Sequence, residues 1–130
     1  MSNYFFKIII LKDNDKKKIK SNLKLKDFSS CYECYYSNQA ITILKKYDLP
    51  YTIIKIDYKN KDNSSLTYPI VYLNKKNSLG NLLLGSYNDL LFVLKKFTNK
   101  YSEKDVNEFM NKYKWSKKIT LRLIELINHL

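Results

Sequence analysis

Short apolar runs with the character of β-strands lie at four places along the chain. Each run is rich in β-branched and aromatic residues and is bounded by polar or turn-forming residues, which is the pattern of a buried strand. The runs cover residues 4–11, 51–58, 70–73 and 81–84. A fifth segment, 19–28, alternates lysine with leucine and is predicted to be a strand joined to 4–11 by a turn at 12–18. Either 4–11 or 19–28 could be the first strand of the sheet.

Apolar positions that recur every three or four residues predict two helices, one between the first two strands of this order and one after the last strand. The first covers 34–48 and stops before Pro50, and the second covers 87–97 with Ser86 or Asn88 as its N-cap. The order is therefore a β-α-β unit followed by a β-β-α unit. This order predicts an α/β fold in which a mixed central β-sheet is flanked by helices.

Residues 99–130 carry the pattern of two further helices. Ser102 and Asp105 form an N-terminal box before the first of them, and Ser116 is positioned to cap the second. A chain of 130 residues has room for about one domain. We expect residues 1–98 to form that domain and residues 99–130 to be a helical extension packed on it.

Composition places the chain among globular proteins. Apolar residues make up 45% and charged residues 28% of the sequence, and no apolar run approaches the roughly 20 residues that cross a bilayer. No secretory signal is recognisable around residues 4–11. We therefore expect a cytoplasmic location, which for a viral protein means the host cytoplasm or the virion, and no membrane partner.

The chain is strongly basic, with 24 Lys and Arg residues against 12 Asp and Glu residues and a net charge of +12. Such a charge attracts nucleic acid. All the basic residues except Arg122 are lysines, however, whereas phosphate and base recognition favour the planar guanidinium of arginine. The abundant Lys, Asn, Ile and Tyr also share AT-rich codons, so genome composition alone can produce the bias. Specific nucleic-acid binding is therefore not expected.

The two cysteines of the chain form the motif Cys31-Tyr32-Glu33-Cys34. This C-x-x-C spacing is typical of redox or metal chemistry, but a zinc site needs four ligands and His129 is the sole histidine, so one chain lacks a ligand set and only a site shared between two chains stays open. A pair of buried structural thiols is the plain alternative. At a helix start, the first-turn N–H groups and the helix dipole favour a thiolate at Cys31, while an inward Cys34 stays protonated and resolves a mixed disulfide. The charge of Glu33 disfavours that thiolate.

Three segments, taken in order, resemble the glutaredoxin branch of the thioredoxin superfamily. They are the Cys31–Cys34 motif at a helix start, Thr67-Tyr68-Pro69 before a strand, and Gly85-Ser86-Tyr87-Asn88-Asp89-Leu90 before the last family helix. The resemblance covers about residues 19–98 and implies a thioredoxin-like fold with a redox-active centre.

The resemblance also implies roles for residues outside the cysteine motif. Pro69 would be cis and lie against the cysteine pair, and Tyr68 would present its backbone to an extended peptide or to glutathione. Tyr87, Asn88 and Asp89 would hold the γ-glutamyl carboxylate and amino group of glutathione.

The chain departs from the family in several places. Ser86 stands where the family has a second glycine, Tyr-Glu separates the cysteines, and residues 28–30 contain no lysine ahead of them. The segment 58–69 is too short for the family's second helix of about three turns. One face of the sheet would then be bare, and we expect the helices of 99–130 to cover it.

These observations predict a thiol–disulfide oxidoreductase without a metal or other cofactor, with glutathione as co-substrate. Cys31 attacks, Cys34 releases the product, Tyr32 is a candidate for substrate binding, and Tyr36 is expected to be one of twelve tyrosines without a special role. The partners would be disulfide-containing or glutathionylated proteins, and a homodimer stays open. The alternatives are a thioredoxin-fold interaction module with a basic surface and weak or no redox activity, a nucleic-acid-binding protein, and a dimer-bridged iron–sulfur protein.

Overall fold

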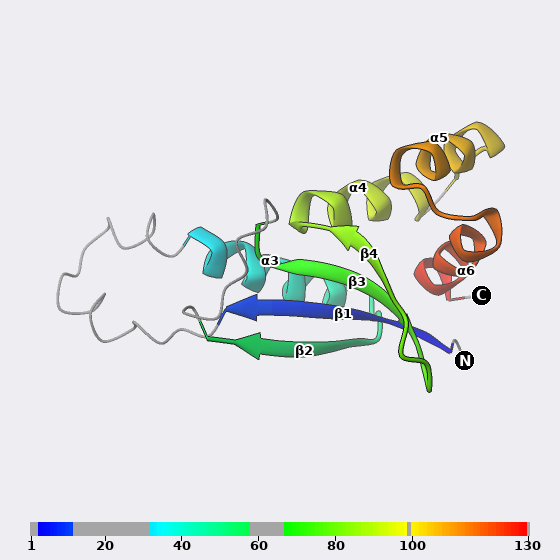
Figure 1. Cartoon of the computed structure of the whole chain (residues 1–130). Coiled ribbons are helices and arrows are strands. Elements are labelled where there is room, and N and C mark those ends of the chain that lie inside the picture. Colours follow the sequence, from blue (N-terminus) through cyan, green and yellow to red (C-terminus); the bar gives the residue numbers. More distant parts are fainter. Residues whose placement is uncertain (1–2, 12–31, 58–66, 99, 130) are drawn as a thin grey trace, which may run out of the picture.

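The central strand of the sheet, β1 (Tyr4–Leu11), has a neighbour on each side. A computed structural model of the chain describes residues 3–11, 32–57, 67–98 and 100–129, without the side chains of residues 32–34. β1 runs parallel to β2 (Tyr51–Ile56) and antiparallel to β3 (Ile70–Lys75), and β4 (Asn81–Gly85) is antiparallel to β3, so the sheet is mixed. The strands lie in the order β2-β1-β3-β4 (Figure 1).

The four predicted strands that fall on described residues are confirmed, with small differences at their ends. β2 stops at Ile56, two residues before the predicted end, and β3 continues two residues further to Lys75. The predicted strand 19–28 and the turn at 12–18 lie outside the described residues.

Side-chain alternation along β1 creates the core face of the sheet. Phe6, Ile8 and Ile10 are buried, whereas the residues between them are only partly covered. Phe6 is the register partner of Leu73 on β3 and of Tyr51 on β2. Because paired residues of adjacent strands point to the same side, this face continues across the sheet.

Helices α3 (Tyr32–Lys46) and α4 (Tyr87–Phe97) confirm the helix predicted between the first two strands and the helix predicted after the last strand, and the ends of α4 are those predicted. After α3, Asp48 adopts a left-handed φ of 55°, and the Leu49 N–H donates to the Leu44 carbonyl at 2.9 Å. This arrangement satisfies a carbonyl at the end of the helix and turns the chain into β2. α4 buries the expected apolar stripe of Leu90, Val93, Leu94 and Phe97.

Helices α5 (Glu103–Tyr113) and α6 (Lys117–Asn128) begin at the predicted caps. The Ser102 hydroxyl accepts from the Asp105 N–H at 3.2 Å, while the Asp105 carboxylate accepts from the Ser102 N–H at 2.9 Å. The Ser116 hydroxyl accepts from a first-turn N–H of α6 in the same way. Both helices contribute to the hydrophobic cluster that contains the core face of β1, through Val106, Phe109, Leu123, Ile124, Leu126 and Ile127.

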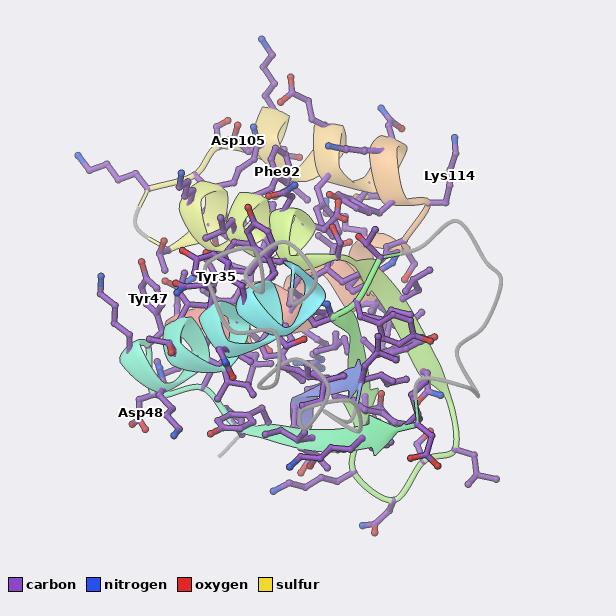
Figure 2. All side chains as sticks on the ribbon, turned by 90° about the vertical axis from the view of Figure 1, so that its left-hand side faces the viewer. Tyr35, Tyr47, Asp48, Phe92, Asp105 and Lys114 are labelled. Atoms are coloured by element: carbon purple, nitrogen blue, oxygen red, sulfur yellow. The ribbon has the colours of Figure 1, made fainter. Side chains whose placement is uncertain are left out.

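The position of α6 contradicts the expectation that the C-terminal helices cover the opposite face of the sheet. α6 contacts β1 and α4, and near its end the Asn128 amide donates to the Phe97 carbonyl at 2.9 Å. The His129 ring nitrogen Nε2 lies 3.0 Å from the Tyr47 carbonyl, just beyond α3. α6 therefore completes the helix layer where α3 and α4 end, and Figure 2 shows the helices on one side of the twisted sheet. The connections on either side of α5, residues 98–102 and 114–116, are too short to carry the chain round the sheet.

Phe109 offers a test of how strongly α5 is built into this core. Its side chain is fully buried, so Phe109→Ala is expected to lower the free energy of unfolding by about 3–5 kcal/mol through lost burial and a cavity. Urea denaturation measures the change. The control is Leu121→Ala on the exposed side of α6, which should change stability by only about 0.5 kcal/mol. Equal small losses in both variants would show that α5 is not part of the cooperative core.

Candidate functional site

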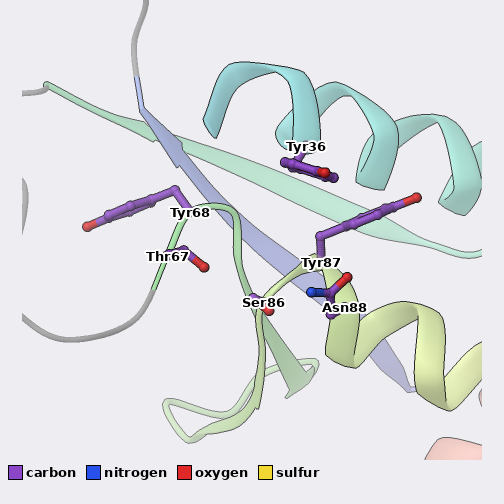
Figure 3. Close-up of a pocket in the computed structure, with 6 residues that line it drawn as sticks. All are labelled: Tyr36, Thr67, Tyr68, Ser86, Tyr87 and Asn88. Atoms are coloured by element: carbon purple, nitrogen blue, oxygen red, sulfur yellow. The ribbon is translucent and has the colours of Figure 1, made fainter. Parts of the chain in front are cut away.

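A small, solvent-open hollow lies where α3, the segment before β3 and the start of α4 meet. Its free volume of about 30 Å³ is far below the range of about 300–1,000 Å³ that small-molecule sites occupy, so it admits a single small group, and the rest of a ligand would lie on the surface around it. Three of the predicted binding residues, Tyr68, Tyr87 and Asn88, are brought together here. The complete lining, shown in Figure 3, is Tyr36, Thr67, Tyr68, Ser86, Tyr87 and Asn88.

The Tyr68–Pro69 peptide bond is cis, as the family resemblance implied. Both residues are buried, and β3 begins immediately after them at Ile70. In Figure 3 the Tyr68 ring points away from Tyr36 and Tyr87. Tyr68 lines the hollow, but its ring does not lie between the rings of Tyr36 and Tyr87.

Three tyrosine rings form an aromatic wall beside the hollow. The ring centroids of Tyr36 and Tyr87 lie 5.3 Å apart, and those of Tyr35 and Tyr36 lie 5.0 Å apart in an edge-to-face arrangement. Burial, reinforced by the neighbouring hydroxyls of Tyr35 and Tyr36, raises the pKa of Tyr87 above its ordinary value. The Tyr87 hydroxyl therefore keeps its proton at neutral pH and can donate a hydrogen bond.

Tyr36, which was expected to be one of many tyrosines without a special role, lines the hollow. The structure places it against Tyr87 although the two are separated by 51 positions in the chain. One signal in the sequence was available, because Tyr36 follows Tyr32 by four residues and so shares its side of the helix. Helical spacing alone could not tell whether that side faced the core or a pocket.

The start of α4 is shaped by Asp89. Its carboxylate oxygen Oδ2 accepts from the Ser86 N–H at 2.8 Å and lies 3.3 Å from the Ser86 hydroxyl. The other oxygen, Oδ1, accepts from the Tyr113 hydroxyl at 2.6 Å. Gly85, at φ +136°, lets the carboxylate come this close, because a Cβ there would lie 2.1 Å from Oδ2. Both carboxylate oxygens of Asp89 thus bond to groups of the protein, and Asp89 does not line the hollow. The resemblance had implied that Asp89 would bind the amino group of glutathione.

The cysteine motif is only partly within the described residues. Cys31 lies outside them, as do the side chains of Tyr32, Glu33 and Cys34. The backbone of α3 begins at Tyr32, so the predicted helix start at the cysteine motif is confirmed. Tyr36, which lines the hollow, follows Cys34 by two residues on this helix. The thiolate at Cys31 and the influence of Glu33 stay predictions.

The described side chains supply no metal centre. Among them, no group of three His, Cys, Asp or Glu residues could hold an ion. None of the helices in this part of the chain combines the length and the apolar character needed to span a membrane. The chemistry of the hollow must be judged from this chain alone, because no family model, curated protein or solved structure matches it.

Gly85 tests whether the close approach of Asp89 matters for the fold. Gly85→Ala is expected to lower the free energy of unfolding by about 1–3 kcal/mol from backbone strain, with a further loss from the contact with Asp89. The control is Gly80→Ala in the β3–β4 turn, where the nearest atom to an added Cβ is the Ser78 hydroxyl at 3.7 Å. Chemical denaturation should show little change for the control. An unaffected Gly85→Ala would mean that the Asp89 contact is dispensable.

Tyr113 predicts a dependence of stability on alkaline pH. Burial, followed by the hydrogen bond to Asp89, raises the pKa of Tyr113 in the folded state. The unfolded chain releases this proton near pH 10 while the folded protein retains it, so the free energy of unfolding should fall as pH rises above about 10. Urea denaturation between pH 8 and 11.5 should show a shallower fall for Tyr113→Phe than for the wild type. Parallel curves would contradict the prediction, since both proteins share the same lysines.

Proposed function

We propose that the protein is a glutaredoxin-like thiol–disulfide oxidoreductase that uses Cys31 and Cys34. The observation that carries the proposal is the meeting of three segments at one hollow. These are the helix that begins at the cysteine motif, the cis Tyr68–Pro69 segment and the N-terminus of α4. The mixed sheet, with one helix after β1 and another after β4, is compatible with a thioredoxin-like fold.

The proposed reaction follows from thiolate chemistry at a helix start. The Cys31 thiolate attacks one sulfur of a substrate disulfide, so a new S–S bond forms and the other substrate sulfur leaves as a thiolate that takes up a proton. Cys34 then loses its proton and attacks the Cys31 sulfur. This step releases the second substrate thiol and leaves a Cys31–Cys34 disulfide. Two molecules of glutathione return it to the dithiol and are themselves oxidised to glutathione disulfide.

The hollow supplies groups for holding the substrate beside this dithiol. The N–H groups of Tyr87 and Asn88 belong to the first turn of α4 and have no acceptor within the helix, so they favour a carboxylate such as that of glutathione. The protonated Tyr87 hydroxyl and the Asn88 amide add neutral donors. Tyr68 lies immediately before the start of β3, and the family resemblance assigns its backbone the role of bonding to an extended peptide in the manner of an added strand.

Two cysteine variants test the proposal. Cys31→Ser should lower the rate of hydroxyethyl disulfide reduction by glutathione more than about a hundredfold, because the nucleophile is lost. Cys34→Ser should still turn over the mixed disulfide with glutathione but lose most insulin reduction, which needs the resolving thiol. Wild-type rates equal to those of Cys31→Ser in both assays would reject the oxidoreductase and favour an interaction module.

A further inference from the structure

Helix α5 lies outside the part of the chain that resembles the family, yet its last residue reaches the candidate site. The Tyr113 hydroxyl donates to Asp89 Oδ1 at 2.6 Å, across 24 positions of sequence. Asp89 in turn receives the Ser86 N–H, and Ser86 lines the hollow together with Tyr87 and Asn88. A continuous chain of hydrogen bonds thus runs from the C-terminal extension to the wall of the hollow.

The ring of Tyr113 is itself held in place. Its centroid lies 4.6 Å from that of Phe109 and 6.3 Å from that of Phe92, and the Lys112 ammonium lies 5.4 Å above it. Nearby, the indole N–H of Trp115 donates to the Leu83 carbonyl at 3.3 Å. The end of α5 is therefore fixed on both sides of Gly85: Trp115 bonds to Leu83 on β4, and Tyr113 bonds to Asp89 on α4.

This anchoring decides how firmly the start of α4 is fixed. With Tyr113 on one oxygen and Ser86 on the other, the Asp89 carboxylate has a single orientation that satisfies both partners. Without the Tyr113 hydroxyl, Oδ1 loses a charge-assisted hydrogen bond in a partly buried place, and the carboxylate can turn toward solvent. The Ser86 N–H would then lose its acceptor for part of the time, and the turn that presents Tyr87 and Asn88 would loosen.

We infer that Tyr113 is a positioning residue for the candidate site, acting through Asp89 to hold the α4 N-terminus in the geometry that takes the carboxylate of a glutathione mixed disulfide. The inference rests on the proposed function for the identity of the ligand. It gives the C-terminal extension a part in substrate binding as well as in the core. A purely structural role would lower the stability of the fold and leave substrate affinity unchanged.

Steady-state kinetics with the mixed disulfide of glutathione and 2-mercaptoethanol provide the test. Tyr113→Phe should raise KM about fivefold, the usual effect of one lost hydrogen bond. Its kcat should stay unchanged, because Tyr113 contacts α4 and α5, whereas α3 is the helix that begins at the cysteine motif. The matched control is Tyr101→Phe, which removes the hydroxyl of an exposed tyrosine that packs its ring on Phe97. A Tyr113→Phe enzyme with wild-type KM would overturn the inference.

A double-mutant cycle separates action through Asp89 from an independent effect. Asp89→Ala should raise KM at least as much as Tyr113→Phe, and the double variant should be no worse than Asp89→Ala alone. Additive losses would overturn the proposed route. If Asp89→Ala proves too unstable to assay, the amide exchange rate of Ser86 in Tyr113→Phe decides whether the effect passes through Asp89.

The exchange rate of the Ser86 amide hydrogen tests the role of Tyr113 without an activity assay. The Ser86 amide should exchange about five- to tenfold faster in Tyr113→Phe than in the wild type, while amides of β1 keep their protection. Unchanged exchange at Ser86 would overturn the inference even if the enzyme is active. A wild-type protein that reduces no disulfide would instead reject the proposed function, and the exchange rates would still decide whether Tyr113 fixes the turn.

Discussion

The burial of one face of β1 beneath the helices is the constraint on which the rest of the structure depends. Phe6 and Ile8 are completely shielded from solvent, and β1 is bonded to a strand on each side. Each such side chain contributes about 1.5–3 kcal/mol when it is buried. Because all the core helices lie on this side, α6 must fit beside α3 and α4. This requirement makes the C-terminal helices part of the core and brings α5 within reach of β4 and the start of α4.

Local features of the sequence were enough to predict most elements. α4 was predicted to its ends, because an apolar stripe with helical spacing coincides with a serine cap and a following polar segment. The caps at Ser102 and Ser116 were also found, since capping depends on residues only three positions apart. β2 and β3 shifted by two residues, at ends where the apolar character fades gradually. The placement of α6 was wrong because the side of the sheet on which a helix packs is decided by tertiary contacts and by the length of the connections.

The candidate site shows the same division between local and long-range information. Tyr68, Tyr87 and Asn88 could be predicted from motifs, and they do meet. Tyr36 could not be separated from other tyrosines, because the direction of its ring depends on how α3 sits beside α4. The hydrogen bond between Tyr113 and Asp89 joins two helices across 24 positions of sequence, so no local pattern of residues predicts it. The position of Asp89, three residues after Ser86, is typical of a helix cap and accounts for the bond of Oδ2 to the Ser86 N–H. The capping pattern does not specify a partner for Oδ1, which accepts from Tyr113.

The indole of Trp115 occupies a main-chain acceptor on β4. β4 is an outer strand of the described sheet, and unpaired main-chain groups on such a strand invite another chain to add alongside. The Trp115 N–H already bonds to the Leu83 carbonyl, and this largely buried ring packs edge-on against Phe109 at 5.2 Å. An incoming strand would have to lift the α5–α6 turn away before it could pair at this position. The turn between these two helices thus obstructs strand addition at Leu83.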